Sequence, residues 1–139
     1  MNDKMKKLLL ILIIIPFTVI GQEKDIENKV KKYVKEWINL VDNEKYNLSW
    51  EKSDKLVQNL VSIENWKNLM VGSRNPLGKN ISRNIISTEN KTEIQGAPDG
   101  DYYIIVYKSE FENKKNAIET ITIKKSEDGS WKVAGYYIK

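Results

Sequence analysis

The sequence predicts an α+β fold in which N-terminal helices pack on a curved antiparallel sheet of about four strands. Apolar residues recur every three or four positions as far as Met70, a spacing typical of amphipathic helices. Beyond the turn at residues 74–78 they recur at every second position, which is typical of strands. Because the helices precede the strands and do not alternate with them, the order favours an α+β arrangement.

The first 21 residues have the pattern of a secretory signal peptide. Lys4, Lys6 and Lys7 form a basic start, a run of Leu and Ile follows, and Gly21 offers a small residue for cleavage. We therefore expect export to the periplasm or the medium, and a single domain over residues 22–139 that has no membrane contact after cleavage. The alternative is an uncleaved anchor, but a membrane-spanning helix needs roughly 20 apolar residues and this run is shorter.

Three or four helices are expected next. The first follows one apolar stripe, with Asp25 as its cap and its end at residues 42–43. The stripe consists of Ile26, Val30, Tyr33, Val34, Trp37, Ile38 and Val41. Tyr46 and Trp50 are four residues apart and predict a second, short helix, and residues 56–61 predict another.

Ser62 is expected to cap a further helix that ends at Gly72. Its inward side chains would be Trp66, Leu69 and Met70.

Four strands complete the expected fold. Ile81, Arg83 and Ile85 share one face of the first, and longer strands follow over residues 101–111 and 116–125. The last strand covers residues 131–138, with Gly135 as a bulge or bend. We expect the sheet to wrap around the first helix and form a cone with one open end.

Several residues in this order resemble a family of exported bacterial proteins whose domain has no assigned function. They include Trp37, Asp42, Tyr46, Trp50, Trp66, Arg74, Arg83, residues 96–100, Glu119 and the closing Trp131-Lys132-Val133-Ala134-Gly135-Tyr136-Tyr137. The resemblance implies a cystatin-like cone of the kind found in nuclear transport factor 2-like proteins. It implies no activity, because cones of this kind include enzymes as well as binding modules.

The composition excludes most strong catalytic motifs. The chain has no cysteine and no histidine, so disulfides, thiolate nucleophiles, zinc-thiolate sites and histidine bases are excluded. We expect no metal and no cofactor. Loss of residues 1–21 lowers the formal net charge from +4 to +2, and the remaining charges are interspersed, so nucleic-acid binding is not expected.

Two charges of opposite sign interrupt apolar strand faces. Arg83 lies between Ile81 and Ile85, and Glu119 lies between Ala117 and Ile121. One interpretation is an Arg–Glu pair that lines the cone and binds a polar ligand. The other is a structural ion pair whose members satisfy each other.

Aromatic side chains supply the other candidates. The candidate ligand-binding residues are Arg83, Glu119, Trp37, Tyr46, Trp50 and Tyr107. Aromatic rings line many apolar ligand pockets, but they also fill ordinary cores, and the spacing fits both.

The strand over residues 101–111 is apolar on both faces. Tyr102, Ile104 and Val106 share one face, and Tyr103, Ile105, Tyr107 and Phe111 share the other. Both faces should therefore be covered. One would pack on the helices, and the other would meet a second copy in a homodimer or be covered by terminal segments.

Three functions follow as hypotheses. The first is a non-enzymatic module that binds a small ligand or an envelope protein. The second is a cofactor-independent isomerase- or cyclase-like enzyme that uses Asp42, Tyr46 or Glu119. The third is a structural role in envelope assembly.

Overall fold

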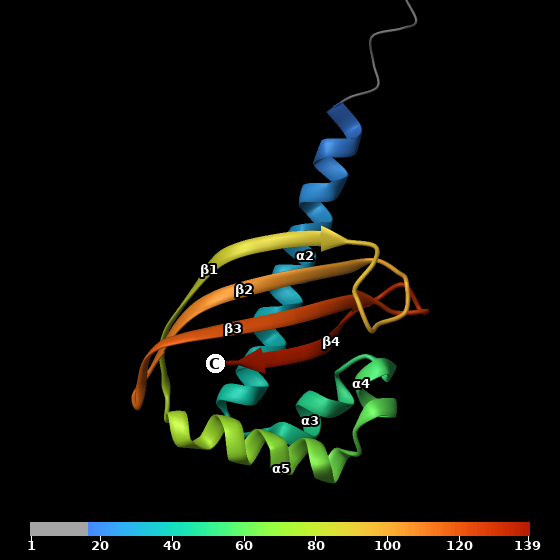
Figure 1. The fold of residues 1–139 in the computed structure, drawn as a ribbon. Coiled ribbons are helices and arrows are strands. Elements are labelled where there is room, and N and C mark those ends of the chain that lie inside the picture. Colours follow the sequence, from blue (N-terminus) through green and yellow to red (C-terminus); the bar gives the residue numbers. More distant parts are fainter. Residues whose placement is uncertain (1–16) are drawn as a thin grey trace, which may run out of the picture.

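The computed structural model describes residues 17–139 (Figure 1). The helices come first and the strands follow. The elements are α2 (Phe17–Asp42), α3 (Tyr46–Glu51), α4 (Lys55–Leu60), α5 (Ile63–Arg74), a 3₁₀ helix (Asn75–Leu77), β1 (Asn80–Lys91), β2 (Tyr102–Phe111), β3 (Lys114–Lys125) and β4 (Trp131–Ile138).

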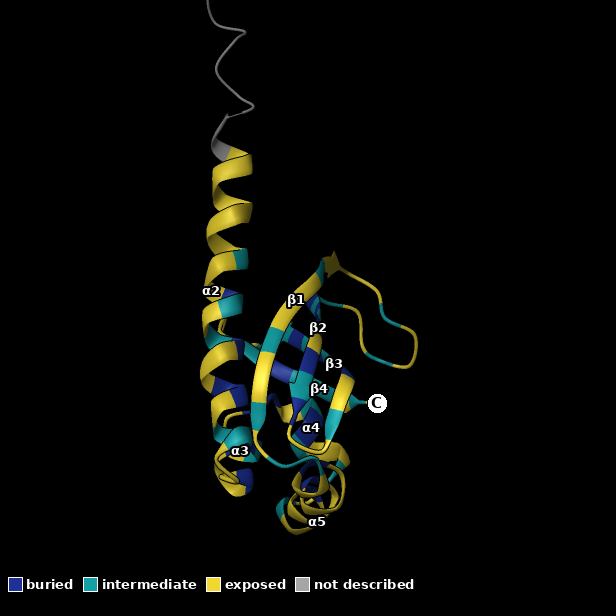
Figure 2. Ribbon diagram, turned by 90° about the vertical axis from the view of Figure 1, so that its left-hand side faces the viewer, coloured by how far each residue is buried: buried dark blue, intermediate teal, exposed yellow. Residues whose placement is uncertain are grey.

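The predicted α+β class is confirmed. The strands form one antiparallel sheet in the order β1-β2-β3-β4, which is curved but not closed into a barrel. Helix α2 crosses one face of the sheet, and α3, α4 and α5 lie at one end of it (Figures 1 and 2). No helix among the described residues covers the opposite face, which we call the outer face (Figure 2).

The core lies between α2 and the inner face of the sheet. The stripe predicted for the first helix supplies one side of it, since Val30, Val34, Trp37, Ile38 and Val41 are at most 4% exposed. The sheet supplies the other side through alternate residues, a consequence of the two-residue period of a strand. These are Tyr103, Ile105, Tyr107, Ile121, Ile123 and Val133. Each fully buried side chain of this size contributes roughly 1.5–3 kcal/mol.

Three helix details differ from the predictions. Asp25 does not cap α2, because the helix already runs from Phe17 and Asp25 lies within it. Helix α5 does not end at Gly72 but continues to Arg74, since one glycine weakens a helix without stopping it. The chain then tightens into the 3₁₀ helix that contains Pro76. Leu69 points outward and is 61% exposed, although Trp66 and Met70 are buried as expected.

The capping prediction at Ser62 is confirmed. The Ser62 hydroxyl accepts a hydrogen bond from the amide of Asn65 at 3.3 Å. Helix α4 has a similar cap, because the Asp54 carboxylate accepts from the amide of Leu56 at 2.9 Å.

Bulges change which side chains face inward on the edge strands. The β1–β2 register shifts between Asn80 and Ser82 and again between Ile85 and Ser87. Ile81 lies at the first shift and is 59% exposed. Ile85 stands opposite Tyr107 on the same face as Arg83, but on this edge strand it is still 42% exposed, so the two isoleucines do not form the buried apolar face that the sequence suggested around Arg83. In the β3–β4 pairing, a shift between Thr122 and Ile123 inserts an extra residue into β4.

Most of the predicted signal peptide, residues 1–16, lies outside the described residues. Residues 17–21 form the start of α2. Within residues 17–139, no helix is both long enough and apolar enough to cross a membrane.

Gly78 joins the helical half of the chain to the sheet. It has φ +75° and ψ −161°, a backbone conformation that is essentially restricted to glycine. A Cβ at this position would lie 2.7 Å from Glu112 Oε2, which accepts a hydrogen bond from the amide of Lys79 at 2.9 Å. The turn thereby ties the start of β1 to the β2–β3 hairpin.

We predict that Gly78→Ala lowers the free energy of unfolding by about 1–3 kcal/mol, because a side chain is both strained and crowded there. Gly72→Ala is the matched control. Gly72 lies in α5, and a methyl group added there would meet no neighbouring atom within 4 Å, so alanine should stabilise the helix by roughly 0.5–1 kcal/mol. Urea denaturation measures both, and equal effects of the two substitutions would contradict the interpretation.

Candidate functional site

Arg83 bridges two carboxylates inside the fold. Its Nε donates to Glu119 Oε1 at 2.6 Å, and its Nη1 donates to Asp42 Oδ2 at 2.8 Å. Its Nη2 is shared between Asp42 Oδ1 at 3.0 Å and Glu119 Oε2 at 3.3 Å. Asp42 is the last residue of α2, and Glu119 lies on the inner face of β3. One guanidinium on the edge strand β1 therefore connects the long helix to the middle of the sheet.

Glu119 accepts as many hydrogen bonds as a carboxylate has lone-pair positions. Besides the two from Arg83, Oε1 accepts from the Ser109 hydroxyl at 2.5 Å and Oε2 accepts from the Tyr136 hydroxyl at 2.6 Å. A carboxylate offers about four such positions, so all of them are occupied. Glu119 is also fully buried. It has neither the exposure nor the free acceptor that contact with a ligand requires.

Arg74 completes the cluster from the end of α5. Its Nη2 donates to Asp42 Oδ1 at 3.0 Å and its Nη1 donates to the carbonyl oxygen of Gly78 at 2.7 Å. Its guanidinium carbon stands 4.2 Å from the centre of the Phe111 ring, a distance suited to a cation–π contact. We call Asp42, Arg74, Arg83 and Glu119 the ion cluster. Its two positive and two negative charges cancel.

The pKa of Asp42 follows from these contacts. Burial would raise it, but the hydrogen bonds and charge of Arg83, followed by those of Arg74, outweigh burial and lower the pKa below its usual value of 3.8. Asp42 is thus a stable anion and a poor general base near neutral pH.

Tyr136 is held in its neutral form. Burial, and then the adjacent charge of Glu119 and the hydrogen bond to it, raise the pKa of the Tyr136 hydroxyl well above its usual range. The hydroxyl therefore remains a proton donor to Glu119.

Aromatic rings occupy the space beside the ion cluster. Trp37 makes edge-to-face contacts with Trp66 and Tyr136, at centroid distances of 6.3 and 5.6 Å. The indole N–H of Trp37 donates to the carbonyl oxygen of Ser49 at 2.9 Å, and that of Trp66 donates to the Ser49 hydroxyl at 3.0 Å. The rings are packed and their polar atoms have partners, as in an ordinary core.

The remaining candidates, Trp50, Tyr46 and Tyr107, have separate partners or surroundings. Trp50 is half-buried and its indole N–H donates to the carbonyl oxygen of Val61 at 2.9 Å. The Tyr46 hydroxyl donates to Asn75 Oδ1. Tyr107 is buried on the inner face of β2, and burial, partly opposed by the charge of Arg83, raises its pKa to about 12. The structure brings Arg83 and Glu119 together as predicted, but it does not gather all six candidates around one cavity.

Trp37, Trp50, Arg83, Tyr107 and Glu119 line none of the five best-formed surface pockets of the described residues. Tyr46 does line a pocket of about 300 Å³, together with Asp42 and Arg74. Among these pockets, the ion cluster therefore borders one, through Asp42 and Arg74.

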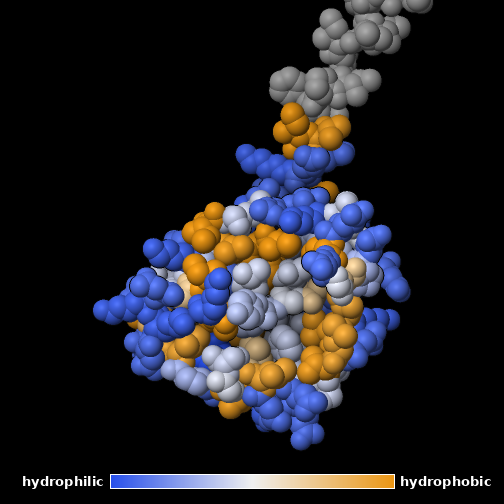
Figure 3. All heavy atoms as spheres, viewed as in Figure 1, coloured by the Kyte–Doolittle hydropathy of each residue, from blue (hydrophilic) through white to orange (hydrophobic). Residues whose placement is uncertain are grey.

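The outer face of the sheet is uncharged across its middle. The strand register places Val106, Thr120 and Tyr137 in one row and Ile104, Thr122 and Gly135 in the next. Figure 3 views this face, which is pale and orange in its middle and mostly blue around its rim. At one end of the face the β1–β2 loop covers Tyr102, whose hydroxyl donates to the carbonyl oxygen of Pro98 at 2.5 Å.

A protein-family model described as "Protein of unknown function (DUF4019)" matches residues 33–136, which is more than half of the chain. The chain belongs to the DUF4019 family. No curated protein and no solved structure matches it. The cystatin-like cone that the resemblance implied therefore stays a prediction for this DUF4019 domain.

Three members of the polar interior of this DUF4019 domain were not predicted as partners of Glu119 or Asp42. Ser109 and Tyr136 donate to Glu119, and Arg74 donates to Asp42. A period of two along the strand predicted over residues 101–111 does place Ser109 on the same face as Tyr107, so the sequence pattern could have indicated that residue. Arg74 lies in a helix end beside a turn, where no periodicity indicates an inward direction.

The ion cluster predicts a loss of stability in acid. The pKa of Asp42 is lowered on folding, so its contribution is present above the unfolded value of about 4 and is lost as the pH falls below it. Urea denaturation at neutral pH and at several values below pH 4 should show a steeper loss for the natural chain than for Asp42→Asn.

Asp25→Asn, on the exposed part of α2, is the control, and its free energy of unfolding should fall in acid as steeply as that of the natural chain. A titration of the Asp42 carboxyl by NMR gives a second readout that does not need the variant to fold. A pKa above 3.8 for Asp42 would contradict the assignment.

Proposed function

We propose that this chain is an exported, non-enzymatic interaction module that pairs with a second copy through the outer face of its sheet. The outer face carries the proposal, because it is the uncharged surface that no helix of the described chain covers (Figures 2 and 3). The interior argues against the enzymatic alternative, since that alternative required a carboxylate with a raised pKa in an open pocket, whereas the pKa of Asp42 is lowered and Glu119 is fully buried.

The interior offers little room for substrate chemistry. Glu119 is fully buried and has its four acceptor positions filled, and Trp37, Trp66 and Tyr136 pack beside it. Of the three proposed catalytic residues, Asp42 and Tyr46 line a surface pocket. The two arginines hold Asp42 as an anion there, and the Tyr46 hydroxyl donates to Asn75.

The composition of the outer face suits an interface. Its middle consists of the uncharged residues Ile104, Val106, Thr120, Thr122, Gly135 and Tyr137. Charged residues such as Glu89 and Lys108 lie nearer its edges. Protein–protein interfaces have the same plan, with a charge-depleted core and a polar rim. Rim charges of both signs let one copy complement another across a two-fold axis.

The size of the face limits the strength of pairing. Strands rise about 3.3 Å per residue and are spaced about 4.8 Å apart, so four strands of about eight residues present about 500 Å². Two such faces bury about 1,000 Å², which is the low end for a specific interface. We therefore expect a reversible homodimer and not a permanent one.

Sedimentation velocity over a concentration series that extends to millimolar tests the pairing. The natural chain should shift from monomer to dimer, whereas Thr120→Lys, in the middle of the outer face, should remain a monomer because it buries an unpaired charge. Asn68→Lys, on the exposed side of α5, adds the same charge elsewhere and should dimerise like the natural chain.

The proposal is wrong if the natural chain stays a monomer at millimolar concentration, or if Thr120→Lys dimerises equally well. Urea denaturation of Thr120→Lys shows that the variant is folded.

Export rests on the basic start and the apolar run of residues 1–21. Expression of the full chain in a bacterium, with fractionation and N-terminal sequencing, should give a protein outside the cytoplasm that begins at Gln22. Leu12→Asp interrupts the apolar run and should hold the protein inside. An intact N-terminus on a membrane-bound protein would instead support the anchor alternative.

A further inference from the structure

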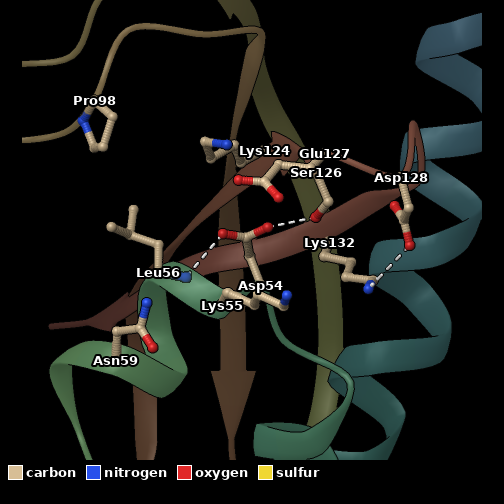
Figure 4. Close-up of a pocket in the computed structure, with 10 residues that line it drawn as sticks. All are labelled: Asp54, Lys55, Leu56, Asn59, Pro98, Lys124, Ser126, Glu127, Asp128 and Lys132. Atoms are coloured by element: carbon tan, nitrogen blue, oxygen red, sulfur yellow. Dashed lines mark hydrogen bonds and ion pairs between the residues drawn. The ribbon is translucent and has the colours of Figure 1, made fainter.

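A surface pocket of about 360 Å³ lies at one end of the sheet (Figure 4). Its walls come from α4 and the residue before it, from Pro98 in the β1–β2 loop, and from the β3–β4 turn with the adjoining strand ends. Small-ligand pockets have volumes of about 300–1,000 Å³, so this one is large enough for a ligand of modest size.

The floor of the pocket is fixed. Asp54 is 5% exposed, its Oδ1 accepts from the amide of Leu56 at 2.9 Å, and its Oδ2 accepts from the Ser126 hydroxyl. Its own amide donates to the carbonyl oxygen of Val133 at 2.7 Å. These bonds join α4 to the β3–β4 turn, so a ligand would meet a preformed site.

Some charged side chains that line the pocket already have partners within the protein, and others do not. Lys132 pairs with Asp128 at 3.5 Å, and both oxygens of Asp54 hold donors. Within residues 17–139, Lys55 and Glu127 take part in no ion pair of 4 Å or less.

Lys124 is available too. Its ammonium donates to the carbonyl oxygen of Lys125 at 3.3 Å, which leaves two further N–H donors. The pocket thus presents ammonium groups and one carboxylate that have no charged partner in the described chain.

Apolar surface borders these charges. Leu56 and Pro98 lie on the same side of the pocket, away from the Asp128–Lys132 pair (Figure 4). An aliphatic group held between them would lose contact with water, and a charged group beside it would face the middle of the pocket, where Lys55, Lys124 and Glu127 are drawn.

The geometry points to a binding site for a zwitterionic ligand with an apolar side chain, namely an amino acid or short peptide with free termini. The α-carboxylate would lie at Lys55 and Lys124, the α-ammonium at Glu127, and the side chain against Leu56 and Pro98. A simple anion fits less well because Glu127 would repel it, and a simple cation fits less well because the lysines would repel it. The site goes beyond the proposed dimer and does not depend on it.

Titration of the ¹⁵N-labelled protein with the dipeptide Leu-Leu, followed by NMR, tests the site. Saturable shifts should be centred on the amides of Leu56, Asn59 and Ser126, with a Kd on the order of 0.1–1 mM, as expected for a small ligand in an open pocket. Blocking either terminus of the peptide, by acetylation or by amidation, should weaken binding about two- to fivefold, the usual effect of one partly exposed ion pair.

Two variants assign each charge to its partner. Glu127→Gln should weaken binding of Leu-Leu but not of acetylated Leu-Leu, which has no ammonium to lose. Lys55→Gln should weaken binding of Leu-Leu more than binding of amidated Leu-Leu, which has no terminal carboxylate. Glu64→Gln, on α5 and outside the pocket, should bind like the natural chain.

The inference is overturned if no saturable shift appears, or if the shifts centre elsewhere on the protein. It is also overturned if Glu127→Gln weakens the free and acetylated peptides equally, because the ammonium would then not be at Glu127. Thermal unfolding of each variant verifies that the fold is intact.

Discussion

The fold depends on one guanidinium that holds three elements together. Arg83 of β1 bonds Asp42 at the end of α2 and Glu119 in the middle of β3, and Arg74 from the end of α5 bonds Asp42 as well. Removing one member of a buried ion pair typically costs about 3–5 kcal/mol, because the partner is left as an uncompensated charge. The four charges are therefore stable only as a set, and the set exists only when helices and sheet are correctly docked.

This constraint also decides where the chain can meet other molecules. The polar groups that might have bound a ligand inside the fold are engaged with one another, and aromatic rings pack beside them. The groups that can still contact another molecule lie at the surface, on the uncharged outer face of the sheet and in the pocket beside α4 (Figures 3 and 4). The interior fixes the helices against the sheet, and the surface is where we propose that recognition takes place.

Much of the fold was predictable because its elements obey simple periods. The stripe from Val30 to Val41 and the alternation in β2 and β3 follow from burying one side of a helix or one face of a strand. The boundaries were less predictable. Gly72 and Asp25 were interpreted as an end and a cap, yet helical hydrogen bonding continues through both. The pairing of Arg83 with Glu119 was predicted, since two opposite charges on inward faces are best satisfied by each other.

The sequence by itself determined the class of the fold, the order of its elements and the absence of histidine and cysteine chemistry. Only the tertiary structure decided which polar groups meet. The extra residue in β4 is the plainest case, because without that bulge a period of two from Val133 would turn Gly135 and Tyr137 inward and leave Tyr136 outside. With it, Tyr136 reaches Glu119 and Tyr137 joins the outer face. Hydrophobic periodicity is local, whereas a bulge and a buried ion cluster depend on strands and helices that are far apart in the chain.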